Sequence, residues 1–416
     1  MTTQASAPPS TKSQALRSYD VADFPALTGL EEEWRFTPLK RLRGLVGGDG
    51  SGSRPRAGGA ELASSGAQAA TGTVRHEYGD LPEGVTVERI ASDDPRVGSV
   101  LTPVDRVSAL AYGGAGQALL VRVDSSAVVA APVSLRVVGD SAEGVAFGHT
   151  FIEVERFAEV TVVLEHVGSA TLADNVEVSV ADGAKLTLVT VADWADDAVQ
   201  AQHLKVRLGR DAKVVHVQVS LGGDLVRQST SVEYTERGGE AELYGLYFAD
   251  SGQHLEHRQL VDHTVPDCRS YVGYRGALQG ESARTVWVGD VLIRAEATGT
   301  DTYEINRNLL LTDGARADSV PNLEIETGEI AGAGHASATG RFDDEQLFYL
   351  MARGIPESEA RRLVVRGFFA ELINKIPVEE LRERLGDAIE ARLASGGSEL
   401  AAPALAGGDP TARAGA

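Results

Sequence analysis

Histidines carry the clearest chemical potential in this sequence. The segment HLEHRQLVDHTVPDC brings together His254, His257, Asp262, His263 and Cys268. Imidazole and thiolate suit iron and zinc, so this segment is a candidate metal or sulfur-handling site. Residues three apart on a strand point to opposite faces, whereas His257 and His263 are an even number apart and could share one. The competing interpretation is ordinary packing or hydrogen bonding inside a β fold, with Cys268 as a small buried hydrophobe.

His335 stands in a different setting, within EIAGAGHASATG. Gly332, Gly334 and Ala336 give its imidazole little local packing, and glycine permits close approach by another backbone. An unperturbed histidine pKa of about 6.5 leaves a neutral nitrogen available to a metal near neutral pH. No catalytic set accompanies His335, so it is better suited to completing a site with a partner than to catalysis alone. A satisfied histidine in an interface is the alternative.

Several kinds of chemistry are absent from the sequence. It has no GxxxxGK[ST] phosphate loop, no GxSxG elbow and no HExxH motif, which argues against nucleotide hydrolysis and against the common hydrolase and metalloprotease sites. An iron–sulfur cluster usually needs about four thiolate or imidazole ligands. Cys268 is the single cysteine, so this chain alone cannot enclose a cluster in the usual way, and any cluster it touches must be shared.

Charge, hydropathy and cysteine count narrow the range of possible binding partners and cellular compartments. The formal net charge of −21 opposes binding to nucleic acid and to anionic membranes. No apolar run approaches the roughly 20 residues needed to cross a bilayer. The first residues, MTTQASAPPSTKSQ, lack the features of a secretory signal, and a single cysteine suits a reducing compartment. We therefore expect a cytoplasmic protein that binds neither nucleic acid nor membrane.

The chain divides by composition. We expect disorder over residues 1–15, an N-terminal module over 16–96 with a flexible loop at 47–73, and a disordered tail over 395–416. In the module, FPALTGLEEEWRFTPLKRL predicts a short helix followed by packed aromatics, with Trp34 buried.

Residues 97–340 have short β-branched runs with period-two alternation, which predict strands. Turn phrases recur at Asp182 (DGAK), Arg210 (RDAK), Arg237 (RGGE) and Asp313 (DGAR), and the first three are about 27 or 28 residues apart. This spacing is typical of a stacked repeat. It favours a mainly β fold with a right-handed parallel β-helix core; a β-sandwich with accidental turn similarity is the alternative.

Residues 341–394 change to a helical pattern. Asp343 and Gln346 resemble a capping box, Gly354 suits a helix end, and Pro356 and Pro377 suit the starts of two further helices. These helices form either a cap or a docking surface. The predicted apolar positions are Leu347, Leu350 and Met351 on the first helix and Leu363, Val364, Phe368, Leu372 and Ile373 on the second.

Two long segments carry a family resemblance. They are EEEWRFTPL from Glu31 and NRNLLLTDGARADSVPNLEIETGEIAGAGHASATGRFDDEQLFYLMARGI from Asn306 to Ile355; Asp262, Gly276 and Trp287 also match. The chain resembles the SufB/SufD family of iron–sulfur cluster assembly proteins, and within it the SufD branch. The resemblance implies a parallel β-helix between an N-terminal region and C-terminal helices.

The resemblance also implies partners. SufD-type chains pair with SufB, and each binds a SufC ATPase. SufC would dock on the helices from Asp343 to Ile373, and SufB would pair with β edges around Leu309 to Ile325. The isolated chain would hold no stable cofactor: iron or a nascent cluster would be transient and shared with SufB, ATP would act through SufC, and a homodimer could form without SufB. His335 matches the histidine implicated in cluster formation. The candidate partner-binding residues are Leu309, Leu311, Leu347, Phe348, Leu350, Met351, Arg353, Gly354, Leu363 and Phe368.

Departures from the family pattern favour the SufD branch. SufB-like chains carry a sulfur-accepting cysteine where this chain has Asn306, and they tend to have glutamate where it has Ala336. Some SufD chains have a cysteine where this one has Ala333. We therefore expect a non-catalytic scaffold subunit. The alternatives are a SufB-like primary scaffold and a β-helix polysaccharide hydrolase or lyase, against which the aromatic content of 6% argues.

Overall fold

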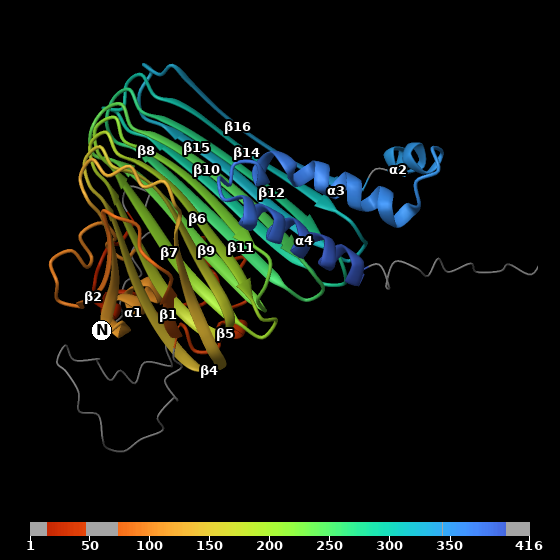
Figure 1. Cartoon of the computed structure of the whole chain (residues 1–416), viewed down its shortest axis with the longest axis horizontal. Helices are drawn as coiled ribbons and strands as arrows, with labels where there is room; N and C mark the ends of the chain where they lie inside the picture. Colours follow the sequence, from red (N-terminus) through yellow and green to blue (C-terminus); the bar gives the residue numbers. More distant parts are fainter. Residues whose placement is uncertain (1–14, 47–73, 343, 397–416) are drawn as a thin grey trace, which may run out of the picture.

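The structure is a computed structural model that describes residues 15–46, 74–342 and 344–396. Most of it is a parallel β-helix, in which strands stack in sequence order from β4 at one end to β16 at the other (Figure 1). Of the disorder predicted over 1–15 and 395–416, residues 1–14 and 397–416 lie outside the described residues, as do the predicted flexible loop at 47–73 and the predicted cap at Asp343. Disorder at residues 395 and 396 is wrong, because the last helix continues through Gly396.

The β-helix is flattened into two parallel sheets. β4 and β5 are each 22 residues long and bend through both sheets; afterwards, even-numbered strands extend the first sheet and odd-numbered strands the second. This in-register parallel stacking confirms the predicted β-helix and excludes the β-sandwich. The strands are β4 Val133–Val154, β5 Glu159–Val180, β6 Lys185–Trp194, β7 Val199–Leu208, β8 Lys213–Ser220, β9 Leu225–Tyr234, β10 Glu240–Ala249, β11 His254–His263, β12 Arg269–Leu278, β13 Arg284–Ile293, β14 Asp301–Leu310, β15 Arg316–Ile325 and β16 Gly332–Arg341.

The repeated turn phrases form equivalent corners of successive coils. The residues two positions before β6, β8, β10 and β12 all have positive φ: Gly183 (67°), Asp211 (54°), Gly238 (80°) and Asp267 (59°). Glycine adopts this conformation freely, and aspartate tolerates it better than most residues. A small residue follows at each corner and faces the interior, and Cys268 occupies this position before β12.

The N-terminal module packs on the outer face of the second sheet. Trp34 is buried, as predicted, among apolar residues of the module and of β5, β7 and β9, and the Arg227 guanidinium lies 3.8 Å from its ring centroid. Two strands that precede residue 97 also join the sheet, β1 by pairing with β4 and β2 by pairing with β3. The module's elements are the 3-10 helices η2 Val21–Asp23 and η3 Leu39–Leu42, β1 Val74–Tyr78 and β2 Val85–Ala91. α1 Arg106–Gly114 and β3 Gln117–Val123 follow beyond residue 96 and precede β4.

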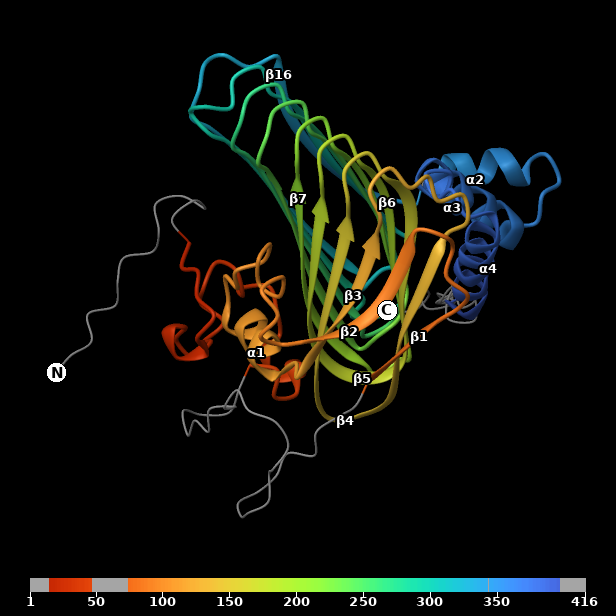
Figure 2. The ribbon, with the colours of Figure 1, turned by 60° about the vertical axis from the view of Figure 1, so that its left-hand side comes forward.

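Three C-terminal helices follow β16: α2 Asp344–Met351, α3 Glu357–Ile373 and α4 Glu379–Gly396. α3 and α4 cover the outer face of β6, β8, β10 and β12, on the opposite side of the β-helix from the N-terminal module (Figure 2). None of the helices within the described residues is long and apolar enough to span a membrane.

The apolar stripe predicted for α3 is partly wrong. Its buried face contains Val365, Phe369 and Leu372, whereas Leu363 is exposed and Phe368 only partly buried. Apolar residues occupy more than one side of this helix, so periodicity alone allowed either face. The face that packs on the sheet continues through buried Ile376 toward α4.

Candidate functional site

The last coil of the β-helix is an open end. β15 and β16 are the terminal strands of the described sheet order, each paired on one side only. His335 lies on β16, and 42% of its side chain is exposed. A Cβ at the neighbouring Gly334 would lie 3.1 Å from the Tyr303 ring, so glycine gives β16 room against β14.

Glu304 lies one coil inward from His335. The two residues are register partners on β14 and β16, and Nδ1 of His335 is 3.7 Å from Oε1 of Glu304. The Glu304 side chain is fully buried, and neither carboxyl oxygen accepts a hydrogen bond of normal geometry. Burial, and secondarily the charge of Asp290, raise the pKa of Glu304 to about 8, partly opposed by the Asn322 backbone amide. A buried carboxyl without a full partner is costly, so it marks a functional candidate.

The surroundings of Glu304 make room for its carboxyl group. The Glu304 side chain extends toward the second sheet, where a Cβ at Gly289 would lie only 2.4 Å from Oε2 of Glu304. On the same sheet, Trp287 Nε1, Thr285 Oγ1 and Ser319 Oγ are buried without hydrogen-bond partners. The open end therefore holds several unsatisfied polar atoms behind His335.

Sequence reasoning missed Glu304. The alternate residues Thr302, Glu304, Asn306 and Asn308 read as a solvated strand face, yet all four are buried. The available signal was the repeat register: His216, Leu243, Val272, Glu304 and His335 occupy one interior column, because β8, β10, β12, β14 and β16 pair in step.

The segment from His254 to Cys268 does not form a cluster. His257 and His263 share the interior face, as their spacing allowed, but each has a different partner: His257 Nε2 lies 2.9 Å from Ser220 Oγ, and His263 Nε2 lies 2.9 Å from Ser270 Oγ. His254 instead contacts Glu256 at 3.2 Å. No group of three or more His, Cys, Asp or Glu side chains that could hold a metal occurs within residues 15–46, 74–342 and 344–396. Metal binding at His257 or His263 stays a prediction.

Cys268 is fully buried, and burial raises the pKa of its thiol. Its carbonyl accepts a hydrogen bond from Asp301 N, just as the carbonyl of Ala184 accepts one from Lys213 N on an earlier coil. A raised thiol pKa disfavours the reactive thiolate. Cys268 therefore resembles the small corner residues of its neighbours more than a reactive centre.

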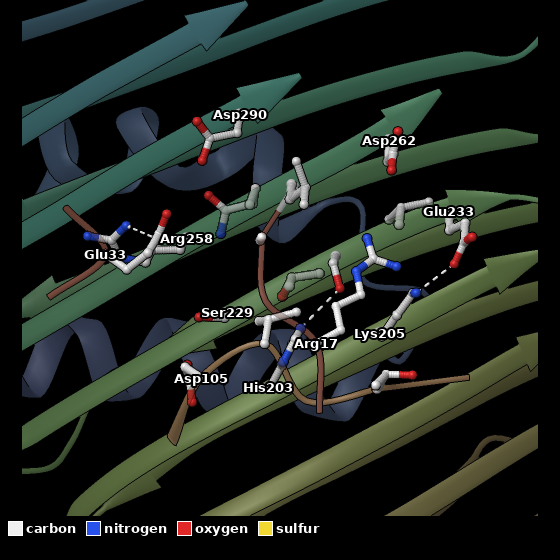
Figure 3. Close-up of a pocket in the computed structure, with 18 of the residues that line it drawn as sticks. Arg17, Glu33, Asp105, His203, Lys205, Ser229, Glu233, Arg258, Asp262 and Asp290 are labelled. Carbon is white, nitrogen blue, oxygen red and sulfur yellow. Dashed lines mark hydrogen bonds and ion pairs between the residues drawn. The ribbon is translucent and has the colours of Figure 1, made fainter. Parts of the chain in front are cut away.

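A groove of about 140 Å³ lies between the N-terminal module and the outer face of β7, β9 and β11 (Figure 3). Its charged side chains pair with one another: Lys205 Nζ lies 2.6 Å from Glu233 Oε2, and Arg258 Nη1 lies 2.9 Å from Glu33 Oε2. The second pair joins the module to β11. The groove's charges therefore help to hold the module on the sheet.

The predicted docking helices expose an apolar surface. Phe348 is 74% exposed and Tyr349 54%, with Met351 of α2 and Leu363 of α3 also exposed. Arg353 lies over the Tyr349 ring at 3.9 Å, and Gly354 follows with a φ of 85°. Leu350 is partly buried, and Leu347 is buried.

Two of the predicted pairing residues do not lie on a free edge. Leu309 belongs to β14, which is paired with both β12 and β16, and Leu311 is buried. Both pack against the cluster formed with the C-terminal helices. Within the described sheet order the terminal strands are β15 and β16, and the predicted range from Leu309 to Ile325 includes a terminal strand only in its second half, Arg316–Ile325. Partner pairing through this range stays a prediction.

Comparisons with known proteins decide the family. Residues 137–368 match the family model described as SUF system FeS cluster assembly, SufBD core domain. The chain belongs to the SufBD family. A SufBD family iron–sulfur cluster assembly protein of Mycobacterium bovis is 55% identical over 388 residues, covering 92% of this chain and 93% of that protein.

More distant SufBD relatives include proteins named SufD. The Bacillus subtilis SufD is 29% identical over 69% of this chain and 65% of its own length, and the Escherichia coli SufD is 28% identical over 47% and 45%. A second SufBD family protein of Mycobacterium bovis is 26% identical over 49% of this chain and 24% of its own length. Asn306 occupies the position at which a SufB-like chain is expected to carry a cysteine. In this SufBD chain, Asn306 is buried and donates a hydrogen bond from Nδ2 to the Tyr247 hydroxyl at 2.8 Å.

Proposed function

We propose that this chain is a non-catalytic scaffold subunit of a SufBCD-type complex. Its open end pairs with a SufB partner, its C-terminal helices bind the SufC ATPase, and iron and the nascent cluster are handled at the paired ends. The observation that carries the proposal is the half-exposed imidazole of His335 on a terminal strand that is paired on one side only. One imidazole supplies only part of a coordination shell, so a partner must supply the rest.

The open end supports pairing. An uncovered strand edge is a liability that proteins usually cover, and here both sheets end in such a strand. The occurrence of two different SufBD proteins in one mycobacterium is consistent with a pair of unlike subunits. The interface would be formed by β15 and β16, placing His335 at its centre.

The helices support ATPase docking. Phe348, Tyr349, Met351 and Leu363 form an exposed apolar surface, which we call the docking face, and aromatic residues are enriched at interface hot spots. Arg275 of β12 donates to the Phe368 carbonyl at 2.6 Å and pairs with Glu371. A movement of α3 on ATP binding would therefore reach β12 and, through its pairing, β14 at the open end.

The experiment compares the chain alone with the chain coexpressed with the SufB and SufC proteins of the same organism. Each sample is purified without oxygen, and its iron, acid-labile sulfide and mass are measured. The proposal predicts a cluster in the complex and none in the purified chain. A solitary monomer that assembles and keeps a full cluster would contradict it, and the same result would favour the primary-scaffold alternative.

A further inference from the structure

The further inference concerns Glu304 and rests on the proposed function, because it assigns a second residue to the site of His335. We propose that Glu304 is a positioning carboxylate: it accepts the Nδ1–H of His335, fixes the orientation of the ring, and leaves Nε2 as the nitrogen that binds iron.

The geometry points to these separate roles for the two ring nitrogens of His335. Nδ1 of His335 faces Oε1 of Glu304 at 3.7 Å, a separation that a small rotation of the half-exposed ring would shorten to a hydrogen bond. The two nitrogens of an imidazole lie on different sides of the ring. Since Nδ1 faces the interior, Nε2 is the nitrogen left for a metal at the open end.

The burial of Glu304 favours a role in positioning His335 over direct binding of the metal. Glu304 has no exposed side-chain surface, whereas His335 is 42% exposed. An ion that arrives at the open end can reach the imidazole without reaching the carboxylate. Histidines that bind metals commonly donate their other N–H to a carboxylate, which fixes the tautomer and makes the ligand more basic.

Two further features describe how the carboxyl group is held, besides the nearby backbone amide of Asn322. Gly289 leaves the space that Oε2 occupies, because any side chain there would collide with it. Neither oxygen accepts a normal hydrogen bond, so the group contributes little to holding the fold together. A buried acceptor of this kind is available to respond when the imidazole gains positive character on binding a metal.

The test uses the purified SufBCD-type complex, with Fe²⁺ titrated against a competing chelator in the absence of oxygen. The titration is run at pH 8.5, above the pKa of about 8, so that the Glu304 carboxyl is largely ionised. Glu304→Gln keeps the shape of the side chain but removes this charge, and we expect Fe²⁺ affinity to fall by about 10- to 100-fold. Asp301→Asn is the matched control, since Asp301 is an exposed carboxylate on the same strand; its affinity should stay unchanged. Gel filtration and a thermal melt establish that each complex is assembled.

A double-mutant cycle distinguishes acting through His335 from acting independently. Glu304→Gln added to His335→Ala should cause no further loss of Fe²⁺ affinity, because the residue it positions is gone. A further loss would overturn the positioning role in favour of direct coordination by Glu304. Normal affinity for Glu304→Gln alone, beside a defective His335→Ala, would overturn this inference and leave the proposed function standing.

Two outcomes remain. Normal affinity in both single variants would contradict the proposed role of His335 itself. If Glu304→Gln impairs assembly of the complex, the test uses Glu304→Asp instead, and the absorption spectrum of bound Co²⁺ is measured. The Asp side chain draws the carboxylate back by one methylene, which should shift the ligand-field bands. An unchanged spectrum would overturn the inference.

Discussion

The ring of His257 stacks on the ring of Tyr247, with centroids 4.7 Å apart and planes 18° from parallel. The same imidazole lies 2.9 Å from the Ser220 hydroxyl, so it joins β8, β10 and β11 inside the β-helix. His216 and His263 are buried in the same interior. Desolvation lowers the pKa of His216, His257 and His263 to about 3. In the folded chain these histidines therefore stay neutral until the pH approaches 3.

The first prediction concerns acid stability. The unfolded chain binds a proton on each such histidine below its ordinary pKa of about 6.5, while the folded chain does so only near 3. The contribution of each histidine to the free energy of unfolding is therefore fully present above about pH 6.5. It falls by up to about 1.4 kcal/mol per pH unit as the pH drops below that value. Urea denaturation at pH 7.5, 6.5 and 5.5 measures this slope. His216→Gln should flatten it, and a slope that His216→Gln leaves unchanged would contradict the assignment.

The second prediction concerns Cys268, which occupies the corner position that Ala184 and Ala212 occupy on earlier coils. Cys268→Ala should cost about 0.5–1.5 kcal/mol, as loss of one buried methyl-sized group does, and should leave iron and sulfide in the complex unchanged. Leu243→Ala, a fully buried interior control, should cost about 2–5 kcal/mol. Loss of the cluster in a stable Cys268→Ala complex would show a chemical role for the thiol.

The third prediction concerns the docking face. Phe348→Asp should weaken ATPase binding by at least about tenfold without changing the melting temperature, because Phe348 is 74% exposed. Phe157→Asp is a matched control, since Phe157 is 60% exposed at a corner far along the sequence from the helices. Pull-down and calorimetry measure both. Equal binding by the two variants would remove α2 from the interface. Leu347→Asp is a poor test, because Leu347 is only 7% exposed and its loss would disturb packing.

The fourth prediction concerns the link between α3 and the sheet. Arg275→Ala removes a hydrogen bond to the Phe368 carbonyl and an ion pair with Glu371. Hydrogen bonds to charged groups contribute about 1.5–3 kcal/mol, so amide exchange in α3 should accelerate about tenfold or more. Arg362→Ala removes only a surface pair with Glu359 on the same helix and should change little. Equal exchange in the two variants would show that Arg275 does not anchor α3.

The β-helix was predictable because its corners are local. A positive φ at each corner selects glycine or aspartate, as at Gly183 and Asp211, so the turn phrase recurs in the sequence at the coil period. Burial of Trp34 followed from its size and from its apolar neighbours in the sequence. The three C-terminal helices followed from capping and proline positions, but their orientation depended on the shape of the sheet beneath them.

The candidate site was only half predictable. His335 could be found because its glycine-rich setting is unusual in the sequence. Glu304 could not be found by alternation, because polar residues at Thr302, Glu304 and Asn306 read as a solvent face although the β-helix turns them inward. For a similar reason the sequence did not show that Leu309 lies on a doubly paired strand or that Leu311 is buried: which strand ends a sheet depends on stacking order, which no local pattern records.

The central claim is that His335 supplies a ligand to a site completed by a partner. The most direct measurement is the iron and acid-labile sulfide content of the coexpressed complex, purified without oxygen, with the native chain and with His335→Ala. We predict that the variant complex assembles with normal subunit composition but loses most of its iron and sulfide. Normal iron and sulfide in a fully assembled His335→Ala complex would contradict the account.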